Sequence, residues 1–237
     1  MNTFKGPFRL MFEDFRLQFY IMTGVTSVLS IFYIVFWILL SSEDTFIGGV
    51  NFGPYYTMFI ILPILAYMKG LKHIISFGGT RKQFLLSTFI NFALFLILST
   101  LVLNSLYLVT EYFARQGITN ATLFHMGHLV NVSSPLLYLW IDTLWGIIIF
   151  GTGFFIVTIW YCYGTLRMMI GATVLAILSM SYITFGELSR IINFIIVEHL
   201  AFVHILAGVG ILMLALSYVI MLNGPLERGK ITTAKSS

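Results

Sequence analysis

The chain has 237 residues, of which 59% are hydrophobic and only 9% are charged, and its mean hydropathy is +0.96. A soluble domain carries about 25% charged residues, so this chain cannot cover a water-facing surface and must face lipid. The net charge of +4 does not require nucleic acid, because membrane topology accounts for it below. A single cysteine, Cys162, excludes an internal disulfide and any multi-cysteine metal site.

Six segments are long and apolar enough to cross a bilayer core, which takes about 20 helical residues. Helices are expected because lipid offers the backbone no hydrogen-bond partners, and the segments lack the alternation of barrel strands. The sequence thus predicts an all-α membrane protein with a six-span domain over residues 20–222, and Pro63 predicts a kink in the second span. The spans are expected near Tyr20–Leu40, Phe52–Met68, Leu85–Val109, Leu136–Tyr161, Met168–Phe185 and Leu200–Leu222.

An additional helix is predicted before the first span, over residues 1–19. Its aromatic residues recur every three or four positions, which aligns them on one helical face. Such a helix lies in the membrane interface with its aromatic face in the acyl boundary. It is either an anchor for the first span or an elbow that also contacts a cytoplasmic partner. The aromatic stripe consists of Phe4, Phe8, Phe12, Phe15 and Phe19.

Basic residues are concentrated on one side of this topology. Only Arg115 and Arg190 fall on the other side. The positive-inside rule therefore predicts that both termini are cytoplasmic, with a flexible tail over residues 223–237, in a multi-pass protein of a bacterial plasma membrane. The basic residues on the predicted cytoplasmic side are Lys5, Arg9, Arg16, Lys69, Lys72, Arg81, Lys82, Arg167, Arg228, Lys230 and Lys235.

The connection between the fifth and sixth spans, residues 186–199, is too apolar for a free loop and too charged for a span. Its isoleucines and Phe194 predict a short helix that dips into the outer leaflet. The tight turn before Arg167 joins the fourth and fifth spans.

The sequence lacks the common catalytic and phosphate-binding motifs, so we expect no enzyme activity and no cofactor or metal in this chain. His125 and His128 lie in the loop after the third span without a nearby carboxylate in sequence, which favours a solvated pair over a metal site. His199 and His204 flank the start of the sixth span and are expected at the interface.

Asp142 is the acidic residue that falls inside a predicted span. A carboxylate there costs about 2.5–3.5 kcal/mol on insertion scales, so it is expected to face protein or water. It is either a polar point on a translocation pathway, paired with Arg115 or Arg190, or a residue that snorkels to the outer interface. Asn91 and Asn104 are candidates for hydrogen bonds between helices, and Asn104 for the pathway.

The predicted cytoplasmic segment 69–84 between the second and third spans is the most specific pattern. Two glycines, Gly78 and Gly79, predict a turn, and Thr80 with Gln83 forms the spacing of a capping box that starts a new helix. Residues 71–77 before the turn can form a short helix along the membrane surface.

The stretch Ser-Phe-Gly-Gly-Thr-Arg-Lys-Gln-Phe at residues 76–84 resembles the "lG-x-T-R-k-x-f" signature of bacterial export permeases, the type-2 class of ABC transporters. The resemblance extends to the elbow, the six spans, the cytoplasmic termini and the outer element between the last two spans. It implies that residues 69–84 are a coupling segment that docks on a separate ATPase subunit.

That resemblance implies a permease that binds no ATP itself: ATP and Mg²⁺ belong to the ATPase subunits, and a second permease subunit, identical or not, completes the pathway. The aromatic and Met-rich composition favours a hydrophobic or amphipathic cargo such as a peptide, antibiotic or lipid-like compound. The alternative is a secondary carrier or channel that uses Asp142 on its pathway. The implied docking residues are Lys72, Ile74, Phe77, Gly78, Gly79, Thr80, Arg81, Lys82 and, in a second contact, Arg167.

Overall fold

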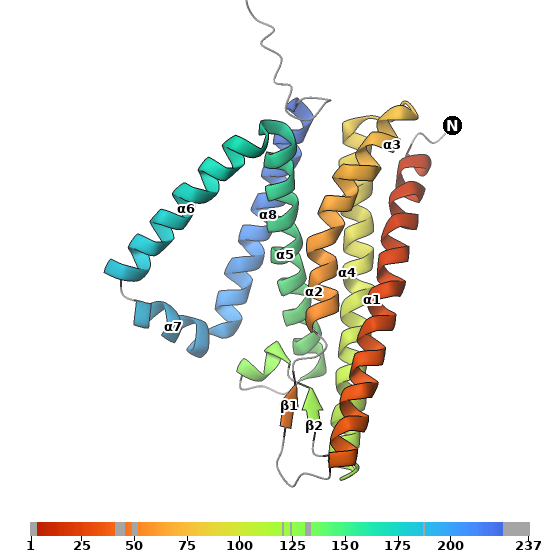
Figure 1. Cartoon of the computed structure of the whole chain (residues 1–237), viewed down its shortest axis with the longest axis vertical. Coiled ribbons are helices and arrows are strands. Elements are labelled where there is room, and N and C mark those ends of the chain that lie inside the picture. The colour runs from red at the N-terminus through yellow and green to blue at the C-terminus, as the bar shows by residue number, and fades with distance from the viewer. Residues whose placement is uncertain are drawn as a thin grey trace, which may run out of the picture.

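The computed structural model describes residues 4–40, 46–48, 52–119, 121–123, 125–130, 134–186 and 188–224. Figure 1 shows long helices packed side by side, with shorter elements at both ends. The helices are α1 (Lys5–Leu40), α2 (Phe52–Leu65), the π-helical turn η1 (Ala66–Gly70), α3 (Leu71–Ser76), α4 (Arg81–Arg115), the 3₁₀ turn η2 (Met126–Leu129), α5 (Pro135–Tyr163), α6 (Thr165–Phe185), α7 (Leu188–Val197) and α8 (His199–Asn223).

Six helical segments of the described chain are long and apolar enough to cross a membrane, as predicted. They comprise α1, the α2–η1–α3 segment, α4, α5, α6 and α8. The connection before the last span contains the predicted short helix, α7. Its dip into the outer leaflet stays a prediction.

Helix α1 runs without a break from Lys5 to Leu40, so the structure marks no boundary at residue 19 between an elbow and the first span. The aromatic stripe explains this continuity. Phe12, Phe15 and Phe19 all lie within 6.2 Å of Phe95 of α4, measured between ring centroids. This part of the stripe therefore packs against protein rather than lipid, and an interfacial position for residues 1–19 stays a prediction.

The second span changes its helical form after Pro63. The proline lies inside α2, and a π-helical turn follows at Ala66–Gly70 before α3 begins. Proline has no backbone N–H and disrupts the regular hydrogen-bond ladder. The irregular turn lets the chain continue into α3 while its side chains remain packed.

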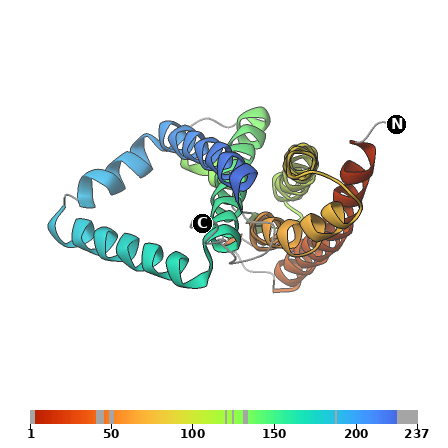
Figure 2. The same cartoon turned by 90° about the horizontal axis from the view of Figure 1, so that it is seen from above.

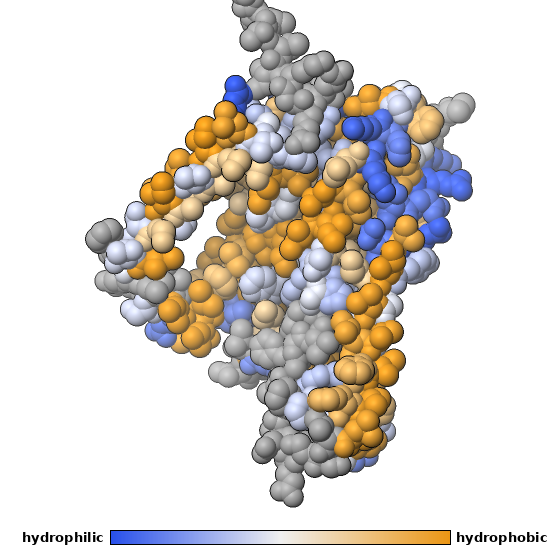
Figure 3. Space-filling view, in the orientation of Figure 1, coloured by the Kyte–Doolittle hydropathy of each residue, from blue (hydrophilic) through white to orange (hydrophobic). Residues whose placement is uncertain are grey.

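Helix α1 begins and α8 ends at the end of the bundle that carries α3 (Figure 1). In the space-filling view, hydrophilic residues gather at this end over the first part of α1 and over α3, whereas the long helices are mostly hydrophobic (Figure 3). This arrangement agrees with an even number of spans. The positive-inside rule alone predicts that this end faces the cytoplasm. The tail residues 225–237 lie outside the described residues.

The core includes close contacts of α5 with both α4 and α8. Phe92 of α4 and Phe150 of α5 stack with ring centroids 3.6 Å apart. The backbones of α5 and α8 approach closely at Gly210, where an added Cβ would lie 2.8 Å from the Cα of Ile148. Glycine removes the side chains that would hold the two helices apart.

Helices α6 and α7 diverge from the rest of the bundle, and seen from above they form an open triangle with α8 (Figure 2). No residue in the most apolar window of α6 is buried. A largely apolar, unburied helix of this length requires lipid or another chain around it.

Two short parallel strands, β1 (Phe46–Gly48) and β2 (Ala121–Leu123), pair at the end opposite α3. The register joins Ile47 to Thr122. The strands connect the segment after α1 with the segment after α4.

Candidate functional site

The turn between α3 and α4, residues 77–80, is built as the sequence predicts. Gly78 has φ of 77°, in the left-handed region that favours glycine. Thr80 Oγ1 accepts a hydrogen bond from the Gln83 backbone N–H at 3.2 Å, and Gln83 Oε1 accepts one from the Thr80 N–H at 2.8 Å. This capping box determines where α4 begins. We call Leu71–Lys82 the α3–α4 corner.

Not every implied docking residue is available on the surface of this corner. Phe77 is 83% exposed, and Lys72 and Lys82 of the same corner are also exposed. Ile74 is only 2% exposed and belongs to the hydrophobic core. Ile74 thus holds the corner onto the bundle and cannot itself contact a partner in this conformation.

Arg81 connects the corner to α8. Its Nη1 donates hydrogen bonds to the carbonyl oxygens of Met221 and Leu222, at 3.3 and 3.1 Å. The last carbonyls of a helix lack intrahelical donors and carry partial negative charge, so a guanidinium stabilises them. Arg81 therefore has a role inside this chain, which the resemblance did not imply.

Arg167 lies in the first turn of α6 and is exposed. Gly164 alone joins α5 to α6, with φ of 84°. The predicted tight turn is confirmed, while the second docking contact stays a prediction.

At the opposite end, Asp142 is fully buried at the centre of a polar cluster. Its carboxylate accepts hydrogen bonds from Asn104 Nδ2 at 2.8 Å, His125 Nε2 at 2.9 Å and Tyr56 OH at 3.4 Å. These donors come from α2, α4 and the segment before η2. They offset the cost of removing a carboxylate from water.

Hydrogen bonding assigns the protons of the two loop histidines. His125 Nδ1 accepts from the Gly127 N–H at 2.8 Å, so its proton lies on Nε2 and points at Asp142. His128 Nδ1 accepts from the His125 N–H at 3.2 Å, and its Nε2 therefore donates to Tyr107 Oη at 2.8 Å. Burial, together with the neighbouring His125, lowers the pKa of His128. In both rings Nδ1 accepts and Nε2 donates in this arrangement.

Two sequence-based interpretations are wrong here. His125 is only 2% exposed and is not part of a solvated pair, because the fold brings the Asp142 carboxylate to it. Asp142 does not snorkel to the interface, and Arg115 forms its ion pair with Glu111 at 2.6 Å instead. By contrast, both predicted asparagine hydrogen bonds between helices are present. Asn104 of α4 donates to Asp142 of α5, and Asn91 Nδ2 of α4 donates to the Phe8 carbonyl oxygen of α1 at 3.2 Å.

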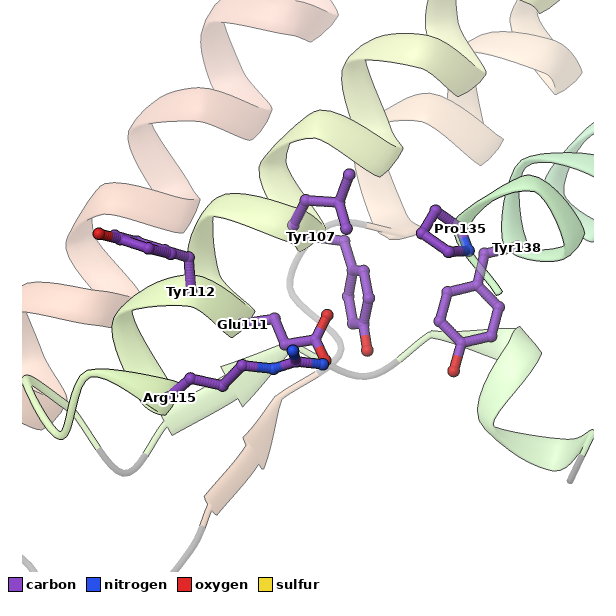
Figure 4. Close-up of a pocket in the computed structure, with 7 residues that line it drawn as sticks. Tyr107, Glu111, Tyr112, Arg115, Pro135 and Tyr138 are labelled. Carbon is purple, nitrogen blue, oxygen red and sulfur yellow. The ribbon is translucent and has the colours of Figure 1, made fainter. Parts of the chain in front are cut away.

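An open pocket of about 370 Å³ adjoins this polar cluster. It lies between the last turns of α4 and the first turn of α5, and Figure 4 shows Tyr107 and Tyr138 side by side in its wall, where their ring centroids are 5.4 Å apart. Both tyrosines also contact the histidines of the cluster. The sequence analysis did not predict this pocket. The available signal was Tyr107 followed by Glu111 and Arg115, at four-residue spacing near the end of the third predicted span. The lining residues are Tyr107, Leu108, Glu111, Tyr112, Arg115, Pro135 and Tyr138.

The chain matches no protein-family model, no curated protein and no solved structure. Its function is therefore argued from its own residues.

In the part of the chain that the structure describes, no three His, Cys, Asp or Glu side chains lie close enough together to bind one metal ion. His204 accepts a hydrogen bond from Trp140 Nε1 at 3.0 Å, which joins α5 to α8. His199 is 3% exposed, whereas His204 is exposed. The interfacial position expected for both histidines stays a prediction.

Proposed function

We propose that the chain is the membrane-spanning permease subunit of an ATP-driven exporter, moved by a separate ATPase that docks on the α3–α4 corner. The observation that carries the proposal is an exposed apolar and basic surface on a rigid turn. Phe77 is 83% exposed, and Lys72 and Lys82 of the same corner are exposed as well. A large exposed aromatic residue on a surface that also carries cations suits a protein partner with an acidic rim.

The corner is connected to two spans, so force applied there has a path into the bundle. The capping box joins the turn to α4, and Arg81 joins it to the end of α8. Helix α8 in turn packs tightly along α5. Closure of an ATPase dimer against the corner would thus move packed helices as rigid bodies.

A second permease subunit belongs to the same proposal. The unburied helix α6 supplies an apolar surface for lipid, for another copy or for a related chain. The cargo is hydrophobic or amphipathic, and ATP with Mg²⁺ is bound by the partner. Such a protein resides in a bacterial plasma membrane and performs no chemistry of its own.

The test is affinity purification of the tagged chain from its native membrane, followed by photolabelling with radioactive azido-ATP. We expect a labelled protein to copurify with the unmodified chain, and Phe77→Glu to lower its yield at least about tenfold, the equivalent of about 1.4 kcal/mol. Ile118→Glu is the matched control, because Ile118 is an exposed residue at the opposite end. Absence of a labelled partner, or equal losses in both variants, would refute the proposal.

A further inference from the structure

The pocket between α4 and α5 has walls of unequal charge and exposure. Glu111 belongs to the wall, with its side chain 30% exposed, whereas the Arg115 side chain is 74% exposed at the rim. Figure 4 shows the Glu111 carboxylate beside Tyr107, with the Arg115 guanidinium reaching it from outside. The two residues therefore satisfy each other through an ion pair whose guanidinium end is mostly exposed and whose carboxylate end is mostly buried.

Such an ion pair is easily exchanged. A surface salt bridge contributes about 0–1 kcal/mol, and the long Arg115 side chain can leave the rim at little cost. An incoming ammonium group that replaced the guanidinium would meet the same carboxylate with the ring of Tyr107 beside it. Aromatic faces attract cations through their quadrupole, more strongly where water is excluded.

The remaining walls suit an apolar substituent. Leu108 and Pro135 line the pocket, and Tyr138 of α5 lies beside Tyr107. The volume of about 370 Å³ lies within the range of small-molecule sites.

We propose that this pocket binds an organic cation, an ammonium group joined to an apolar or aromatic body, with Glu111 as its counter-ion and Arg115 as the competing guanidinium that the ligand displaces. The ligand would enter from the end of the molecule opposite the α3–α4 corner. Binding there also reaches the polar cluster, because Tyr107 Oη accepts the hydrogen bond from His128 Nε2. Binding at this site does not require an ATPase. A binding measurement therefore tests the site independently of the proposed transport function.

The test uses equilibrium dialysis to measure how much radiolabelled phenethylamine binds to the purified full chain in detergent micelles. The amount taken up by protein-free micelles is subtracted. Phenethyl alcohol, phenylacetate and phenylalanine have the same ring but a neutral, anionic or zwitterionic head. We expect phenethylamine to bind at least about tenfold more tightly than the other three, from the ion pair and cation–π contacts. Equal binding of the alcohol, or tighter binding of phenylacetate or phenylalanine, would overturn the proposal.

Two substitutions give opposite expectations. Glu111→Gln should weaken phenethylamine binding at least about tenfold, while Arg115→Gln should strengthen it several-fold by removing the competitor. The matched control is the exposed Glu13–Arg16 ion pair of α1, at the other end of the bundle. Glu13→Gln and Arg16→Gln should leave binding unchanged. Weaker binding in Arg115→Gln would contradict the exchange, even if Glu111→Gln failed to fold.

Discussion

At the scale of single residues, Asp142 shows how a charged group is accommodated inside an apolar bundle. Its partners come from three different parts of the chain, and the shortest two bonds are those to Asn104 and His125. Because His125 Nδ1 already accepts a backbone N–H, its Nε2 proton has a defined direction. The buried carboxylate therefore organises the end of the bundle opposite α3.

A double-mutant cycle tests this pairing. Asp142→Asn and His125→Gln should each lower the free energy of unfolding by about 1–3 kcal/mol, because each leaves a buried group without its partner. The double variant should lose less than the sum, with a coupling of about 0.5–3 kcal/mol. Detergent-denaturant titration followed by circular dichroism measures these values. Additive losses would mean that the two groups do not interact.

At the scale of elements, the contact between α5 and α8 holds the second half of the bundle together. Gly210 faces the α5 backbone, whereas Gly208 on the same helix has nothing within 4 Å of an added Cβ. The two glycines thus have different reasons for being present. Of these two glycines, only Gly210 lies where α8 and α5 approach each other closely.

Substitution by alanine should therefore have opposite effects at these positions. Gly210→Ala should destabilise the protein by about 1–3 kcal/mol, because the added methyl group overpacks the contact. Gly208→Ala should be neutral or stabilise by about 0.5–1 kcal/mol, because alanine is the better helix former. Thermal unfolding of both variants in the same detergent compares them directly. A loss at Gly208 as large as at Gly210 would contradict the assigned contact.

At the scale of the whole molecule, the two candidate surfaces lie at opposite ends. The α3–α4 corner shares its end with the start of α1 and the end of α8, and the tyrosine-lined pocket lies at the other end (Figures 1 and 4). A membrane that crosses the bundle between these ends would separate the two proposed partners. An ATPase would meet the first surface and an external organic cation the second.

Cysteine labelling tests this sidedness. In a Cys162→Ser background, Phe77→Cys should react with a membrane-impermeant maleimide only in inside-out vesicles, and Ile118→Cys only in intact cells. Both positions are exposed, at 83% and 53%, so access is limited by the membrane alone. The reverse pattern would invert the topology predicted from the basic residues.

The sequence by itself determined the six apolar spans, the short helix at residues 188–197 and the capped turn before α4. These features depend on neighbouring residues, since hydropathy acts over one span and a capping box over four positions. It also indicated that Asn91 and Asn104 bond between helices, because polar amides inside apolar spans require partners.

Only the tertiary structure decided which distant groups meet. Arg81 caps α8, His125 reaches Asp142, and Phe12, Phe15 and Phe19 of the α1 aromatic stripe pack on Phe95. The pocket exists because α4 ends beside the start of α5. Each pairing joins segments far apart in the chain, and helix packing, which no local pattern encodes, brings them within bonding distance.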